Sequence, residues 1–188
     1  MGKAYANRKP IEDNDFFETP KCLTQELLKN YPIKGSILEP CCGKFGISNI
    51  LENNGLKVIS KDLIYGNNFI TDDYTNEHYD FVITNPPFKF WNEIVEKAKK
   101  VADKVCVIGR TNYFGSHQRN TSGIWKNLIY IYIFDRQVSY EKKYTDDLVN
   151  CGCLVTAWFI YDKNYDGLPM IKIIDVDKYV RRKKLKKC

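Results

Sequence analysis

Four consecutive residues, Asn85-Pro86-Pro87-Phe88, have the side chains and the spacing to act on a planar amine. The two prolines fix the backbone and cannot continue a central strand, which leaves the carbonyls before them without ladder partners. Asn85 adds an amide oxygen that accepts hydrogen bonds, and Phe88 adds a flat ring. An acceptor pair beside an aromatic face suits the amino edge of a nucleobase. The segment therefore predicts a site for a planar amine, and the alternative is a Pro-Pro turn without function.

A second candidate is the glycine-containing segment LEPCCGKFG, which runs from Leu38 to Gly46. Glycines let the backbone approach a ligand closely, and the helix that follows offers free N–H groups at its start. The chain has no G-x-x-x-x-G-K-[ST] motif, which excludes a P-loop. Asp62 follows about 20 residues later, where an acidic side chain can bind ribose hydroxyls. The alternative for Asp62 is the N-cap of a helix.

The elements that must position these residues alternate along the chain. Helices are predicted at 21–30, 46–54 and 93–101. Strands are predicted at 36–39, 56–60, 80–84, 104–109, 128–134 and 154–161. This alternation predicts an α/β fold with a mostly parallel sheet and helices on both faces. Both candidate motifs follow strands, and such sheets bind ligands beyond the carboxyl ends of their strands.

Composition limits the class of protein. The chain has 188 residues, of which 44% are apolar, so it is long and apolar enough for one domain with a sizeable core. No run of about 18 apolar residues is present, which predicts no membrane span. The first residues lack the apolar stretch of a signal peptide, which predicts a cytoplasmic protein. The seven cysteines are expected to be reduced, and no metal site is predicted because Cys151 and Cys153 lack a second Cys/His pair.

The positive charge is concentrated at the end of the chain. Residues 178–188 hold seven Lys and Arg and no acidic residue, whereas the rest of the chain carries 22 basic and 23 acidic residues. We therefore expect three parts: a flexible segment at 1–12, the domain at 13–177 and a basic tail at 178–188. Such a tail can bind a polyphosphate, and the alternative is a solvated helix end or a disordered tail.

These motifs together resemble those of the S-adenosylmethionine-dependent amino-methyltransferases. The resemblance is to the small adenine-N6 DNA methylases common in phages and mobile elements, and it spans about residues 13–175. Asn85-Pro86-Pro87-Phe88 is similar to the catalytic tetrad of that family. Asp15-Phe16-Phe17-Glu18-Thr19-Pro20 resembles its N-terminal cofactor segment, and Glu39-Pro40-x-x-Gly43 resembles its cofactor loop.

The resemblance implies a Rossmann-like class I methyltransferase fold with an antiparallel strand near the C-terminal end. It also implies that S-adenosylmethionine is the cofactor, bound by a set of residues from five segments. That set is Phe16, Thr19, Pro20, Glu39, Pro40, Cys41, Gly43, Asp62, Leu63, Asn68, Phe69 and Asn85. Two positions depart from the family pattern: the second glycine of the loop is Gly46, one position late, and Asn68 stands where an acid is usual. Asp72 and Asp73 are close in sequence to Asn68.

The implied reaction is direct transfer of the sulfonium methyl group to the N6 amine of a flipped adenine. Asn85 Oδ1 and the Pro86 carbonyl accept hydrogen bonds from the amine, and Phe88 stacks on the base. No general base is required, which agrees with motifs that contain no histidine; His78 and His117 are expected in loops.

Residues 110–127 join two predicted strands and carry Arg110, Tyr113 and Arg119, which we expect to contact the substrate. The alternative for this segment is a lid or a partly disordered crossover. No separate target-recognition domain is evident, so specificity is loose, carried by a loop or supplied by a partner, and a homo-oligomer is one such arrangement.

Three functions stay open at this point. The first is a DNA adenine-N6 methyltransferase, and the second is an N-methyltransferase that acts on an RNA base or a protein glutamine. The third is a cofactor-binding subunit that is catalytically impaired.

Overall fold

The computed structural model describes residues 18–137 and 155–179. In this part of the chain, the strands form a seven-stranded sheet in the order β2-β1-β3-β4-β6-β5-β7. The strands are β1 (Ser36–Glu39), β2 (Lys57–Ser60), β3 (Tyr79–Thr84), β4 (Ala102–Arg110), β5 (Leu128–Phe134), β6 (Thr156–Asp162) and β7 (Met170–Ile174). All neighbouring pairs are parallel except those of β6, which is antiparallel to both β4 and β5. The predicted sheet, with its antiparallel strand near the C-terminal end, is confirmed.

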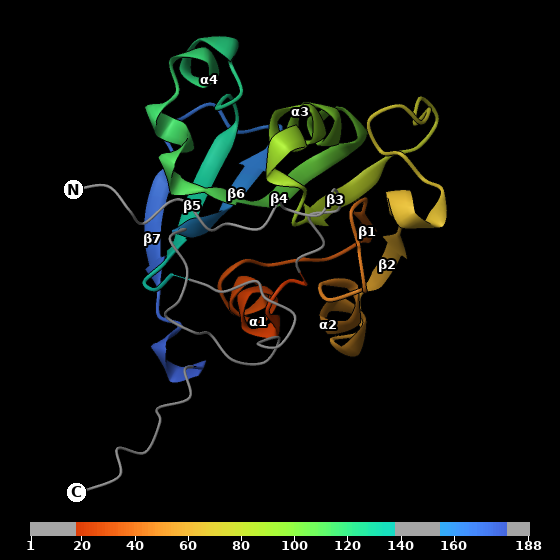
Figure 1. Cartoon of the computed structure of the whole chain (residues 1–188), viewed down its shortest axis with the longest axis horizontal. Coiled ribbons are helices and arrows are strands. Elements are labelled where there is room, and N and C mark those ends of the chain that lie inside the picture. Colours follow the sequence, from red (N-terminus) through yellow and green to blue (C-terminus); the bar gives the residue numbers. More distant parts are fainter. Residues whose placement is uncertain (1–17, 138–154, 180–188) are drawn as a thin grey trace, which may run out of the picture.

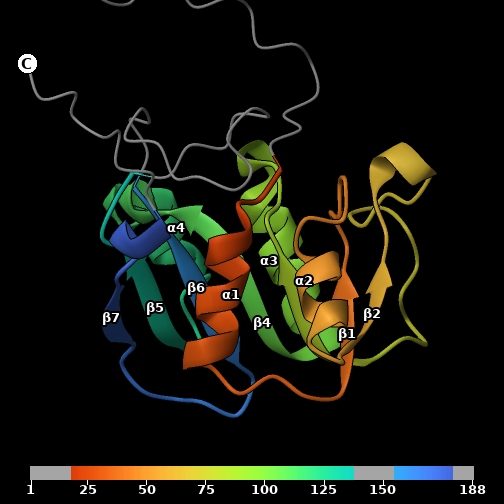
Figure 2. The same ribbon diagram turned by 90° about the horizontal axis from the view of Figure 1, so that it is seen from below.

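Helices cover both faces of this sheet, as predicted. Figures 1 and 2 show α1 (Lys21–Asn30) and α2 (Ser48–Asn53) on one face, and α3 (Trp91–Val101) and α4 (His117–Ser122) on the other. Single 3-10 turns follow several strand ends: η1 (Leu63–Tyr65), η2 (Phe88–Phe90) and η3 (Thr111–Gly115). None of the helices in the described part has the length and apolar character needed to cross a membrane.

Two buried tryptophans connect the helical layers to the sheet through hydrogen bonds. On the α1 face, the fully buried Trp158 of β6 donates its Nε1–H to the backbone oxygen of Leu23 at 2.9 Å. On the α3 face, the fully buried Trp91 donates to the backbone oxygen of Ile108 at 2.9 Å. Gly109 makes this approach feasible, since a Cβ there would lie 2.7 Å from Trp91 Nε1. These contacts set the first turn of α1 against β6 and the first turn of α3 against β4.

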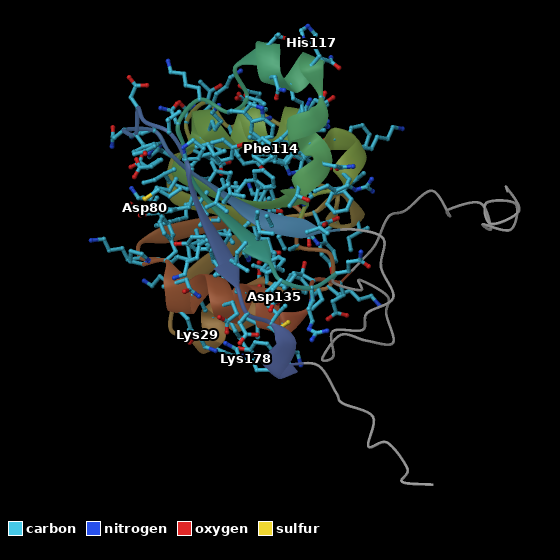
Figure 3. The ribbon with its side chains drawn as sticks, turned by 90° about the vertical axis from the view of Figure 1, so that its left-hand side faces the viewer. Lys29, Asp80, Phe114, His117, Asp135 and Lys178 are labelled. Carbon is cyan, nitrogen blue, oxygen red and sulfur yellow. The ribbon has the colours of Figure 1, made fainter. Side chains whose placement is uncertain are left out.

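The C-terminal turn η5 (Asp177–Tyr179) packs against α1 through Glu26, whose side chain is buried. Lys178 Nζ and Lys29 Nζ each lie 2.9 Å from Glu26 Oε1, and the Tyr179 hydroxyl donates to the same oxygen at 2.7 Å. Figure 3 shows Lys29 and Lys178 close together beside α1, on the face opposite to Phe114 and His117. The first residues of the predicted basic tail are therefore fixed to α1, whereas residues 180–188 lie outside the described part.

Candidate functional site

The carboxyl ends of β1, β2, β3 and β4 meet at one edge of the sheet, where the residues singled out from the sequence lie. One pocket opens there, and five of the predicted residues line it: Thr19, Glu39, Cys41, Gly43 and Asn85. The predicted set of cofactor residues did not include the other lining residues, which are Glu18, Cys42, Lys44, Gly46 and Ile47. Except for Glu18, which precedes Thr19, they all belong to the predicted glycine turn or directly follow it. Phe16 lies outside the described residues.

The glycine turn is held in a strained, open shape. Cys42 N donates to the backbone oxygen of Lys61 at 3.1 Å, which ties the turn to the end of β2. Gly43 has φ +50° and Phe45 has φ +63°, a conformation that costs little for glycine and is uncommon for other residues. No atom lies within 4 Å of the position that a Cβ on Gly43 would take, so the turn presents bare backbone to the pocket.

The displaced second glycine has a structural role. A Cβ on Gly46 would lie 3.3 Å from the backbone oxygen of Thr19 and 3.3 Å from Glu18 Cγ. The absence of a side chain at this position therefore lets the segment before α1 pass close to the turn. Gly46 brings two walls of the pocket together, although it is one position later than the family pattern expects.

Asp62 has the N-cap role considered for it, and it lies next to the pocket lining without being part of it. Its Oδ1 accepts from Ile64 N at 3.1 Å, which caps η1, and its Oδ2 accepts from Gly43 N at 2.8 Å. The N-cap is therefore present, and the same carboxylate also fixes the glycine turn. Because each carboxylate oxygen has two lone pairs, both oxygens can accept a further hydrogen bond from a ligand.

An aromatic pair stands on the outer side of this turn. The rings of Phe45 and Tyr65 are stacked, with centroids 5.5 Å apart, and both are exposed. The Tyr65 hydroxyl donates to the backbone oxygen of Gly43 at 3.0 Å. Sequence reasoning missed this pair because the two residues are joined only by the fold.

Glu39, at the end of β1, is almost completely buried. Burial raises the pKa of its carboxyl to about 8, although hydrogen bonds from the hydroxyl and the backbone N–H of Ser48 oppose the shift. The carboxyl is therefore mostly neutral at pH 7. Burial also raises the pKa of the Cys41 and Cys42 thiols to about 12, so both are neutral and unreactive. No group of three His, Cys, Asp or Glu in the described residues could hold a metal ion.

Asn85 follows β3 directly and points its amide across the pocket. Its Nδ2 donates to Thr19 Oγ1 at 3.1 Å, and Thr19 itself is buried. This bond orients the amide so that Oδ1 is the accepting end, and no described residue donates to Oδ1. An oriented acceptor with a vacant lone pair is what an amine donor requires.

Phe88, three residues after Asn85, forms a cluster with the three residues predicted to contact the substrate, and none of the four lines the pocket. Arg110 Cζ lies 4.5 Å from the ring centroid of Phe88, and Arg119 Cζ lies 4.1 Å from that of Tyr113. The rings of Phe88 and Tyr113 meet edge to face with centroids 6.5 Å apart. The segment 110–127 forms η3 and α4 and packs on Trp91 through Tyr113.

Other predicted cofactor residues do not line the pocket. Leu63 is 68% exposed on η1, and Asn68 Oδ1 accepts from Ile70 N at 3.1 Å within its own turn. Phe69 is buried against Tyr74, with ring centroids 5.1 Å apart, so it serves the core on the α3 face. Pro20 and Pro40 are buried behind the pocket walls.

A sheet of this order, with helices on both faces and a glycine turn after β1, is the Rossmann-like fold of the class I methyltransferases. Two solved structures are similar over most of this chain. One is a modification subunit of a putative type I restriction enzyme from Vibrio vulnificus, with a TM-score of 0.54 and 13% identity over 88% of this chain and 48% of that chain. The other is a predicted O-methyltransferase from Agrobacterium tumefaciens, with a TM-score of 0.51 and 10% identity over 86% and 91%.

The chain thus spans about half the length of the Vibrio subunit. A scan against protein-family models gives no match, and a search of curated proteins gives none either.

Proposed function

We propose that this protein is an S-adenosylmethionine-dependent methyltransferase that modifies the N6 amine of adenine in DNA. The observation that carries the proposal is the orientation of Asn85 by Thr19, because it leaves Oδ1 as an oriented acceptor on a residue that lines the pocket. The tetrad that contains Asn85 supports transfer to nitrogen rather than to oxygen or carbon.

The pocket residues fit this cofactor. The bare backbone of Gly43 leaves room for close approach of a methionine or ribose group, and Asp62 has lone pairs available for ribose hydroxyls. Thr19, Glu39 and Cys41 line the remaining wall. When bound, the cofactor supplies an electrophilic methyl group, and the chain has to hold an amine in line with it.

The amine of adenine is a weak nucleophile because its lone pair is delocalised into the ring. Hydrogen bonds from this amine to Asn85 Oδ1 and to the Pro86 carbonyl favour a pyramidal nitrogen whose lone pair is available. Positioning of the two reactants accounts for much of the remaining barrier. No histidine has to take part, because the proton leaves after transfer; among the described groups, His78 pairs with Asp103 at 2.7 Å instead.

The cluster that contains Phe88 supports a nucleic-acid substrate. Phe88 offers a ring on which an extruded base can stack, worth roughly 1–3 kcal/mol against a flipping cost of a few kcal/mol. Arg110 and Arg119 add positive charge beside that ring. The structural likeness to a restriction-modification subunit favours DNA, and recognition of a sequence is assigned to segment 110–127 or to a partner subunit.

The test is transfer of labelled methyl groups from S-adenosylmethionine to duplex DNA, single-stranded DNA, RNA and protein in parallel. We expect label in DNA as N6-methyladenine. Asn85→Ala should retain the fold and cofactor affinity but lose nearly all transfer, because the lost interaction matters most in the transition state. Asn85→Asp should retain measurable activity, since a carboxylate accepts the same hydrogen bond. Wild-type rates in Asn85→Ala would refute the proposal, and label in RNA or protein alone would replace its substrate.

A further inference from the structure

The two arginines of the cluster sit on aromatic rings in the same way but are held differently. The Arg119 guanidinium lies on Tyr113 and is fixed there, because its Nε donates to Asn92 Oδ1 at 2.8 Å. The Arg110 guanidinium lies on Phe88, and its Nε is buried without a hydrogen-bond partner among the described residues. No carboxylate in that part of the chain pairs with Arg110. Its position therefore depends on stacking alone.

A buried donor without an acceptor is unfavourable, so the guanidinium gains free energy whenever an oxygen acceptor reaches it. Phosphate is the acceptor that suits it best, because the planar fork of an arginine binds phosphate through two parallel hydrogen bonds. A guanidinium is also flat and of a size to cover a six-membered ring. It thus occupies the face of Phe88 as the target base does in the proposed function.

We propose that Arg110 holds the stacking place on Phe88 in the substrate-free protein and gives it up when the base enters. It then binds the phosphate beside the extruded nucleotide. The inference rests on the proposed function, since it names the residue that exchanges places with the substrate of that same site. Arg110 is a positioning residue in this scheme. It covers the ring of Phe88 before the base arrives, and it binds the nucleic-acid strand afterwards.

The scheme separates two effects that a static contact would combine. Removing the guanidinium should make the base easier to bind, because nothing has to be displaced from Phe88. The same change should weaken binding of the backbone, because one phosphate contact is lost. If Arg110 instead stayed in place and stacked on the base, its removal would make the base harder to bind.

The probes are two single-stranded 9-mers of thymidines whose central nucleotide is either deoxyadenosine or an abasic site, titrated in the presence of S-adenosylhomocysteine. The dissociation constant of the abasic probe divided by that of the adenine probe, extrapolated to about 1 M salt where a phosphate contact contributes little, measures what the base contributes. In Arg110→Ala this ratio should rise about 3- to 10-fold, the range expected for loss of a competing cation–π contact. For the adenine probe, the dependence of log affinity on log salt should flatten by about 0.7, the value for one phosphate contact on a single strand.

Two further variants keep the result interpretable. Arg110→Lys keeps the charge but not the planar stacking, so the ratio should rise while the salt dependence stays. Lys89→Ala removes a nearby exposed charge that lies over Phe90, and it should leave the ratio unchanged. A ratio that falls or stays constant in Arg110→Ala, or a wild-type protein that binds both probes equally, overturns the inference.

A direct readout is independent of catalysis. The Nε–H signals of Arg110 and Arg119, assigned with Phe88→Leu and Tyr113→Leu, are followed by NMR as the adenine probe is added. Arg110 should lose the ring-current shift of Phe88 while Arg119 keeps its own. An unmoved Arg110 signal in a protein that methylates adenine refutes this inference but not the proposed function. A moved signal in a protein that methylates no DNA refutes only the proposed function.

Discussion

Ser48 donates its backbone N–H to Glu39 Oε2 at 2.8 Å, so the first residue of α2 is fixed to the last residue of β1. The two residues enclose the glycine turn, and the Ser48 hydroxyl reaches the same carboxyl oxygen as well as Ser60 Oγ of β2. The shape of the pocket therefore depends on a carboxyl group that burial keeps protonated.

The first prediction concerns the pH dependence of stability. Because burial raises the pKa of Glu39 from 4.5 to about 8, the folded protein retains a proton that the unfolded chain loses. Stability from this group is complete below about pH 4.5 and is lost as pH rises to about 8, on the order of a few kcal/mol. Glu39→Gln keeps an acceptor without a charge and should flatten the free energy of unfolding between pH 5 and 8. Urea unfolding at four pH values measures this, with the exposed Glu93→Gln as a control; an unchanged slope in Glu39→Gln would contradict it.

Asp62→Asn should weaken cofactor binding. An asparagine has one accepting atom, whereas Asp62 accepts from Gly43 N and from Ile64 N with different oxygens. One of these bonds must be lost, and a hydrogen bond to a charged group is typically worth about 1.5–3 kcal/mol. Calorimetry with S-adenosylmethionine should show a loss of about tenfold or more. Asp80→Asn is the matched control, since Asp80 also accepts from a backbone N–H, that of Ser36 at 2.7 Å, but at the other end of the strands. Equal affinity in Asp62→Asn and wild type would remove Asp62 from the site.

Gly46→Ala should affect the pocket more than the fold. The added methyl group meets Thr19 O and Glu18 Cγ at 3.3 Å, so the segment before α1 has to shift. We expect weaker binding of S-adenosylmethionine and a loss of about 1 kcal/mol in stability, at the low end for overpacking. Gly115→Ala is the control, because no atom lies within 4 Å of its added methyl group. Binding and melting curves of the two variants should differ; identical curves would show that segment 18–19 does not form a wall of the pocket.

We predict that Glu26 contributes to the loss of stability at acid pH. Burial alone would raise its pKa, but hydrogen bonds from Tyr179, Lys178 and Lys29 outweigh burial and lower the pKa to about 2. The lowered pKa means that this stability is present above about pH 4.5 and is lost as pH falls towards 2. Glu26→Gln should lower stability at pH 7 by on the order of 1–3 kcal/mol and make acid unfolding between pH 4.5 and 2 less steep.

The matched control for Glu26 is Glu96→Gln. Glu96 also faces a lysine three residues later, Lys99 at 3.4 Å, but its side chain is 48% exposed. Exposed pairs contribute little, so this variant should unfold in acid as the wild type does. If both variants behave alike, the η5 turn does not stabilise α1.

The strands β1 and β3 of the site could be predicted from sequence, because each is a short apolar run followed by a proline that cannot continue the strand. Phe81-Val82-Ile83 is stopped before Pro86-Pro87, and Ile37-Leu38 before Pro40. By contrast, β7 was missed because four of its five residues are exposed, so no alternation marks it and its pairing with β5 decides its structure.

Local sequence patterns could not predict the helix α4 or the contacts within the site. The sequence HQRNTS has no apolar residue, and the helix is bounded by the Ser116 hydroxyl, which accepts from Arg119 N at 3.4 Å, and by Gly123 at φ +78°. The bond between Asn85 and Thr19 joins residues 66 positions apart. Motifs could indicate that both residues matter, but only the fold could bring them together.

The place of β6 in the sheet has a consequence for synthesis of the chain. β6 lies between β4 and β5, yet it is made after both of them, and its register with β4 runs from Lys104↔Asp162 to Arg110↔Thr156. Until residue 162 has left the ribosome, β4 and β5 each present an open edge, and α1 lacks Trp158, whose Nε1–H donates to the backbone oxygen of Leu23 in α1. A nascent chain of this protein therefore cannot complete its sheet from the N-terminal part alone, and the open edges of β4 and β5 are available for pairing with other chains until β6 is inserted.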